Sequence, residues 1–252
     1  MKGDQEKLLS AQLVFANGLN LEHGPSLKNF FKTNSNVLFI GDYIQKVKPD
    51  AILKVNGETD PHIWMDISLW KEAIPQVVEA LSRMKPEKKA EFEERGRKLA
   101  QDYSEMHEKI KKYLHEVPQE KRYLVTSHDA FNYFTRAYLA EESEIADNSW
   151  QKRFQAPEGL APDSQLSLND IRFIVEHLKK YNIAIIFPES NLSPDSLKKI
   201  IDAAKNENIN VTLGNPYLYG DAMGPKGSDG DTYLKMIWHN AKTIKEDIGG
   251  SP

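Results

Sequence analysis

A charged helical segment at residues 86–117 constrains the fold more than any other part of this 252-residue chain. Its apolar residues recur in steps of three, four or seven, which is the spacing of one helix face. They are Phe92, Leu99, Tyr103, Met106, Ile110, Tyr113 and Val117. Glutamates also precede basic residues by four positions, as in Glu91–Arg95 and Glu108–Lys112, an arrangement that stabilises exposed helices. The pattern predicts one helix about 48 Å long at 1.5 Å per residue.

Short apolar strands alternate with helices on both sides of this segment. Before it, we predict helices at 3–10 and 27–32; after it, at 130–139, 169–180, 193–206 and 231–247. The predicted strands are Leu13–Ala16, Val37–Ile40, Tyr123–Thr126, Asn182–Phe187 and Ile209–Leu213. This alternation is typical of α/β proteins with parallel sheets. We therefore interpret the long helix as a spine that joins two lobes; a surface helix or a coiled-coil arm is the alternative.

The predicted domains are an N-terminal lobe (1–85), a connecting helix (86–117) and a C-terminal lobe (118–252). Residues 43–59 are expected to be irregular, with one short strand at 52–55. Asp66 is a good N-cap for a helix that reaches Arg83, and Pro75 should break that helix. Residues 141–168 are expected to form a long polar connection.

Composition limits both the partners and the chemistry. Basic and acidic residues number 33 and 37, and the net charge of −4 argues against a nucleic-acid surface. No apolar run approaches the length of a membrane span, and the first ten residues lack the apolar core of a signal peptide. Cysteine is absent, so any metal site must use histidine, aspartate or glutamate.

Three of the polar residues on loops are candidate metal ligands. His62 lies in a loop of the first half, His128 follows the strand 123–126, and Asp221 follows the strand 209–213. Ligands of α/β proteins bind in the loops after strands, and two imidazoles with a carboxylate suit a first-row divalent metal. Spacing alone does not separate these residues from ordinary surface residues. Other histidines, such as His177 and His239, are expected on solvated helix faces.

Several motifs in order carry a resemblance to a known family. Residues 60–66 (DPHIWMD) resemble a DPHxWxD signature, and residues 126–131 (TSHDAF) resemble a TSHxAF element. Residues 11–22 resemble a strand followed by NGLxLE, and matches also occur at 188–190, 220–221 and 230–233. The chain resembles the metal-binding solute-binding proteins of ABC transporters, in the subgroup for zinc, manganese and iron.

The resemblance implies both a fold and a function. The family has two α/β lobes joined by one long helix, with the metal held between them, and its ligands map onto His62, His128 and Asp221. Glu189 is expected to support this site or cap the next helix rather than bind the metal. The chain would then be a periplasmic or cell-surface binding protein, not an enzyme, that delivers zinc, manganese or iron to a membrane permease.

The start of the chain departs from the family pattern. The family's signal peptide, first strands and first histidine ligand precede the position that corresponds to residues 2–4. We therefore expect an incomplete first lobe, weakened metal binding, and a sheet edge at residues 13–16 that favours self-association. Because three ligands and a water are also typical of catalytic zinc, a metal-dependent hydrolase is one alternative. A metal-free fragment that acts by docking to a partner is another.

Overall fold

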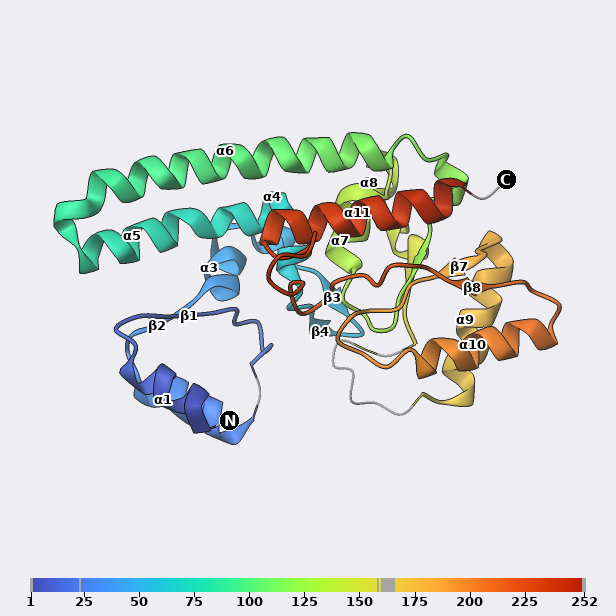
Figure 1. Ribbon diagram of the computed structural model, residues 1–252, viewed down its shortest axis with the longest axis horizontal. Coiled ribbons are helices and arrows are strands. Elements are labelled where there is room, and N and C mark those ends of the chain that lie inside the picture. Colours follow the sequence, from blue (N-terminus) through green and yellow to red (C-terminus); the bar gives the residue numbers. More distant parts are fainter. Residues whose placement is uncertain (1, 23, 158, 160–165, 251–252) are drawn as a thin grey trace. The chain divides into compact units, whose positions relative to one another are not determined.

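The computed structural model describes residues 2–22, 24–157, 159 and 166–250 (Figure 1). Its contacts divide the chain into two compact units. Unit 1 comprises Met1–Ile63 and Leu69–Ala100, and unit 2 comprises Trp64–Ser68 and Gln101–Pro252. The chain therefore passes from one unit to the other after Ile63, after Ser68 and after Ala100.

Unit 1 contains a small parallel sheet. Strand β1 (Val14–Ala16) pairs with β2 (Val37–Phe39), with Val14 opposite Val37, and α2 (Pro25–Thr33) connects them. The other elements are α1 (Lys2–Ser10), α3 (Ile40–Val47), the antiparallel strands β3 (Lys54–Val55) and β4 (Glu58–Thr59), and α5 (Ile74–Met84). The predicted strands and helices that begin before residue 40 are confirmed to within two residues at each end.

Helix α3 corrects the expectation that residues 43–59 are irregular. Ile40 and Ile44 are buried one helical turn apart, and the predicted strand had wrongly included Ile40. Gly41 permits this early start, because its N–H donates to the Asn17 carbonyl at 2.6 Å. An added Cβ at Gly41 would lie only 2.6 Å from that same oxygen. The close approach of two backbone segments therefore requires glycine here.

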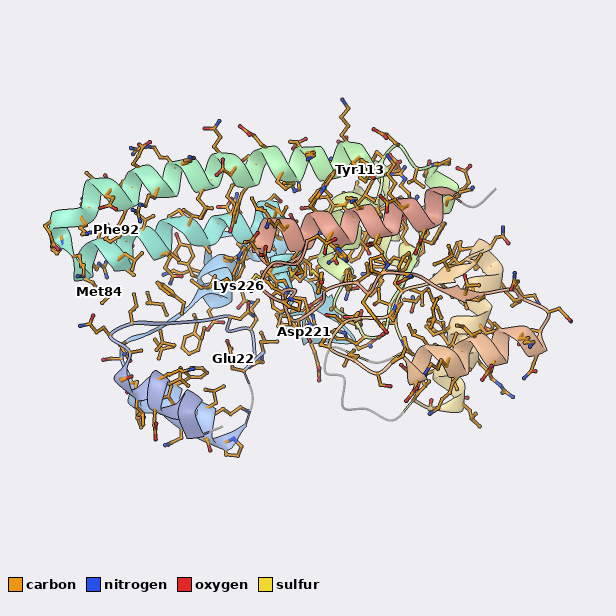
Figure 2. The ribbon with its side chains drawn as sticks, in the orientation of Figure 1. Glu22, Met84, Phe92, Tyr113, Asp221 and Lys226 are labelled. Carbon is orange, nitrogen blue, oxygen red and sulfur yellow. The ribbon has the colours of Figure 1, made fainter. Side chains whose placement is uncertain are left out.

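The long predicted helix is present as α6 (Lys89–Leu114). Its first part lies beside α5 in unit 1 (Figure 1), where a Cβ on Gly96 would be 2.6 Å from the Val78 side chain. Figure 2 labels Met84 at the end of α5 and Phe92 near the start of α6. The second part of α6 belongs to unit 2.

The predicted break in the preceding helix is also confirmed. Helix α4 (Ile67–Trp70) and helix α5 are separated by a 3-10 turn at Lys71–Ala73. Asp66 caps α4, because its Oδ1 accepts from the Ser68 N–H at 2.9 Å. The other 3-10 turns are Pro49–Ala51, Ile63–Met65, Pro86–Lys88, Gln119–Lys121 and Ser149–Arg153.

Unit 2 is built on four short parallel strands. Strand β5 (Leu124–Val125) pairs with β6 (Phe154–Gln155), and β7 (Ile185–Ile186) pairs with β8 (Thr212–Leu213). The Phe187 N–H donates to the Val125 carbonyl at 2.8 Å and joins the two pairs. The helices of unit 2 are the second part of α6, α7 (Asn132–Tyr138), α8 (Glu142–Ala146), α9 (Leu168–Tyr181), α10 (Asp195–Asn206) and α11 (Tyr233–Gly250).

Helices α9 and α10 cover this sheet (Figure 1). Ile174 and Leu178 of α9 and Leu197 and Ile200 of α10 are buried in one cluster with Val125. The α/β class, with parallel strand pairs and one long helix, is confirmed. The strands are shorter than predicted, and the loops that follow β5 and β8 carry the candidate ligands His128 and Asp221.

Residues 141–168 are not the continuous polar connection that we expected. They contain α8 and β6, while residues 158 and 160–165 lie outside the described part. Arg153 anchors this segment: it is 1% exposed, its Nε lies 2.5 Å from Glu144, and its Nη1 donates to the Gln119 carbonyl at 2.8 Å. His177 and His239 are also buried rather than solvated.

Candidate metal centre

His128 follows β5 and is completely buried. The Thr126 hydroxyl donates to the His128 carbonyl at 2.8 Å, which fixes the backbone just beyond the strand. The imidazole therefore starts from a rigid element, at the strand end where sequence reasoning expected a ligand.

Glu189 determines which way the His128 ring points. One carboxylate oxygen accepts from the His128 N–H at 2.9 Å, and the other lies 2.8 Å from His128 Nδ1. Glu189 is fully buried and follows β7, and its own N–H donates to the Ser127 hydroxyl at 3.3 Å. Because Nδ1 is held by this carboxylate, Nε2 is the nitrogen that remains to bind a metal.

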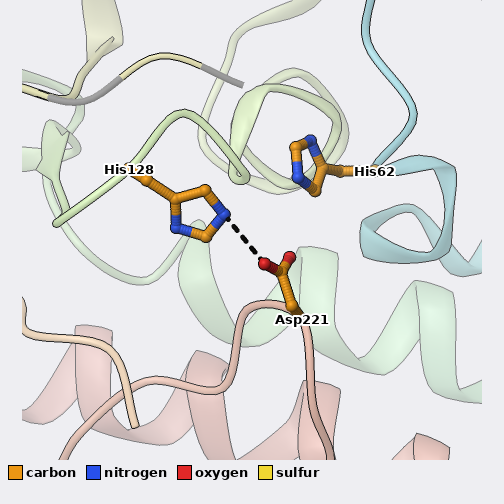
Figure 3. A group of neighbouring side chains, drawn as sticks. All are labelled: His62, His128 and Asp221. Atoms are coloured by element: carbon orange, nitrogen blue, oxygen red, sulfur yellow. Dashed lines mark ion pairs between the residues drawn. The ribbon is translucent and has the colours of Figure 1, made fainter. Parts of the chain in front are cut away.

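Asp221 lies next to that second nitrogen. It belongs to the loop between β8 and α11 (Figure 2), and its Oδ2 is 3.3 Å from His128 Nε2 (Figure 3, dashed line). The Asp221 side chain is 31% exposed whereas the His128 ring is fully buried, so Asp221 is the partly exposed member of the pair. Gly220 allows this approach, because an added Cβ would overlap a Glu189 carboxylate oxygen and lie 3.2 Å from His128 Cε1.

The two carboxylates beside His128 favour a positive charge on its ring. Burial lowers the pKa of His128, but hydrogen bonds to Asp221 and Glu189 and their charges outweigh it and raise that pKa to about 10. Two carboxylates that stabilise a proton on the imidazole also stabilise a metal cation bound there. An imidazole and a carboxylate oxygen are both ligands that first-row divalent metals accept.

His62 belongs to unit 1 and has an equivalent support. Its Nδ1 lies 2.7 Å from Asp60 Oδ1, and the same oxygen accepts from the His62 N–H at 2.9 Å. His62 is 1% exposed and Asp60 is fully buried. Both candidate imidazoles therefore have a buried carboxylate at Nδ1, which leaves Nε2 for a metal.

The structure brings His128, Asp221 and Glu189 together within unit 2 and places His62 beside Asp60 in unit 1. Sequence reasoning assigned no role to Asp60, although a carboxylate two residues before a histidine is a usable signal. The sequence contains no comparable signal for Asn240. This residue lies on α11 and contacts the loop that carries Asp221.

Comparisons with known proteins agree with this arrangement. Residues 2–247 match the family model for the periplasmic zinc-uptake complex component A. The chain is 37% identical over 250 residues to the metal-binding protein YtgA of Chlamydia pneumoniae, covering 99% of this chain and 74% of that protein. It is 31% identical over 255 residues to the manganese-binding lipoprotein MntA of Bacillus subtilis, covering 98% and 76%.

The fold is similar as well. The crystal structure of Fe(III)-bound YtgA from Chlamydia trachomatis superimposes with a TM-score of 0.92 at 33% identity, covering 99% of this chain and 84% of that one. These relatives are binding proteins, which confirms the prediction of a binding protein rather than an enzyme. The chain therefore belongs to the family of periplasmic zinc-uptake component A proteins, the metal-binding solute-binding proteins of ABC transporters.

Proposed function

We propose that this chain binds a divalent transition metal through His62, His128 and Asp221 and delivers it to the permease of an ABC importer. The observation that carries the proposal is the orientation of His128, whose Nδ1 is held by Glu189 while Nε2 faces Asp221. Each of the three residues offers one ligand atom, an imidazole nitrogen or a carboxylate oxygen.

The chain itself supports including His62. Trp64 belongs to unit 2, and its indole N–H donates to the Gly220 carbonyl at 3.0 Å. His62 precedes Trp64 by two residues, and two residues span at most about 7 Å. His62 is therefore tethered to a residue that contacts the neighbour of Asp221.

The ligand types limit which metals the site can bind. Imidazole nitrogen suits zinc and iron and a carboxylate oxygen suits manganese, whereas calcium and magnesium prefer shells made of oxygen alone. The relatives match this range, since one is described as manganese-binding and another is solved with Fe(III). We propose one of zinc, manganese or iron as the native cargo.

The place of action follows from the family. We propose that the chain works in the periplasm or at the cell surface, where the family captures its metal for import. Within the described residues, no helix has both the length and the apolar character needed to cross a membrane.

Calorimetric titration with zinc and with manganese tests the proposed ligands. His62→Ala, His128→Ala and Asp221→Ala should each weaken or abolish binding, because each removes a donor atom. His115→Ala is the matched control, since His115 is half-buried and its charged neighbours include Arg122 and Glu141 but none of the proposed ligands. Unchanged affinity in His128→Ala would reject the assignment.

A further inference from the structure

The backbone just before Asp221 is held by side chains from two distant segments. We propose that Asn240 and Trp64 are positioning residues that fix this backbone and so determine where the Asp221 carboxylate meets the metal. This inference rests on the function proposed above, in which Asp221 is a ligand.

Asn240 binds both polar groups of one peptide residue. Its Oδ1 accepts from the Tyr219 N–H at 2.8 Å, and its Nδ2 donates to the Tyr219 carbonyl at 2.8 Å. Asn240 is fully buried on α11. The amide accepts and donates through two separate atoms, so the contact fixes the orientation of Tyr219 as well as its position.

Trp64 holds the next residue. Its indole N–H donates to the Gly220 carbonyl at 3.0 Å, and the Trp64 carbonyl accepts from the Tyr233 hydroxyl at 2.8 Å. Tyr233 is the first residue of α11, so the same helix that presents Asn240 also anchors Trp64. Both groups that restrain residues 219–220 are therefore fixed to one rigid element.

The rest of the loop is restrained on either side of Asp221. On the near side, the Leu218 N–H donates to the Pro188 carbonyl at 2.9 Å. On the far side, the Gly224 N–H donates to the Gly230 carbonyl at 2.9 Å. His239 lies next to Asn240 and contacts both sides, with Nε2 2.9 Å from the Tyr217 carbonyl and Nδ1 2.8 Å from Asp229.

These contacts have a direct consequence for Asp221. An aspartate has only two side-chain torsions, so the position of its carboxylate depends closely on its own backbone. Its backbone is continuous with residues 219 and 220, whose peptide groups are held by Asn240 and Trp64. Removing either restraint lets the carboxylate move away from the metal without removing any ligand.

The test is a double-mutant cycle measured by competition for Zn²⁺ with a coloured chelator. Asn240→Leu keeps a branched side chain of similar size, removes both hydrogen bonds and adds no charge. Trp64→Phe removes the indole N–H and keeps an aromatic ring. Trp238→Phe is the matched control, because Trp238 is also on α11 but packs against Tyr113 and Lys109.

We expect Asn240→Leu and Trp64→Phe each to weaken zinc binding by about 10- to 100-fold, the usual effect of losing support around a metal ligand. Trp238→Phe should change it less than about twofold. When Asp221→Ala is already present, Asn240→Leu should have little further effect, because it acts through Asp221. An equal loss with and without Asp221 would overturn the inference, as would unchanged affinity in both variants.

A second measurement applies if the variants are less stable, or if their zinc affinities lie outside the range that the chelator can measure. At saturating Co²⁺, the visible absorption bands report ligand geometry rather than affinity. They should change in Asn240→Leu and Trp64→Phe and stay as in the parent in Trp238→Phe. Unchanged bands in the first two would overturn the inference. If Asp221→Ala alone leaves zinc affinity unchanged, the proposed ligand set fails instead.

Discussion

Glu189→Gln should disable the metal site although it removes no ligand. In the native protein, one Glu189 oxygen accepts from the His128 N–H at 2.9 Å, and the other lies 2.8 Å from His128 Nδ1. Glutamine can keep the first contact with its carbonyl oxygen, but its NH₂ group then faces Nδ1. Because an NH₂ group only donates, Nδ1 would have to accept, and the ring proton would move to Nε2. A metal at Nε2 requires the ring proton on Nδ1, where it would face the glutamine NH₂ group instead of an acceptor.

The size of the effect follows from the strength of this contact. Groups that orient a metal-bound histidine usually contribute 10- to 100-fold in affinity, which is about 1.4–2.8 kcal/mol. We place Glu189 at the upper end of this range, because its carboxylate is fully buried. We expect zinc affinity to fall by about 100-fold in Glu189→Gln.

The assay is zinc titration by calorimetry or chelator competition, with thermal unfolding of the metal-free protein measured alongside. Glu144→Gln is the control, since Glu144 is also buried but pairs with Arg153 and Lys152. That variant should unfold at a lower temperature and bind zinc normally. If Glu189→Gln binds zinc as tightly as the parent, the tautomer argument is wrong.

Three further predictions concern other buried groups. Gly220→Ala should weaken zinc binding at least tenfold in chelator competition, because the new Cβ overlaps Glu189; parental affinity would contradict this. Burial, and then the charge of Lys180, lowers the pKa of His177 from 6.5 to about 4, so the neutral ring stabilises the fold fully above pH 6.5 and this contribution is lost as the pH falls toward 4. The free energy of unfolding, measured with urea, should vary with pH by up to about 3 kcal/mol less in His177→Gln than in the parent. An identical pH profile would refute the assignment. Arg153→Ala leaves Glu144 buried without its main partner and should cost about 3–5 kcal/mol in urea unfolding; a loss below about 1 kcal/mol would contradict it.

Local patterns predicted the features that depend on local physics. Helix α6 was predictable because its charge pairs and apolar residues recur at helical spacing along consecutive turns. The break between α4 and α5 was predictable from Asp66 and Pro75. Family motifs located His62 and His128 at positions where the structure buries them.

Features that depend on distant contacts were not predictable. Strand β6 is two residues long, which is too short for a periodic pattern, and it forms through its pairing with β5. The expected polar connection contains β6 because Arg153 finds a buried partner in Glu144. Asn240 and Trp64 contact residues 21 and 156 positions away in the sequence, and no local rule distinguishes them from other polar or aromatic residues.

The segment Trp64–Ser68 belongs to unit 2, although the residues on both sides of it belong to unit 1. Its contacts with unit 2 are therefore like those of a bound peptide. Its Ile67 N–H donates to the Tyr138 hydroxyl at 3.1 Å, and its Trp64 carbonyl and indole bind Tyr233 and Gly220. A fragment of residues 101–252 would lack these partners, so no single cut yields a complete C-terminal unit. Exchange of whole lobes between relatives would therefore have to carry this short segment along with residues 101–252.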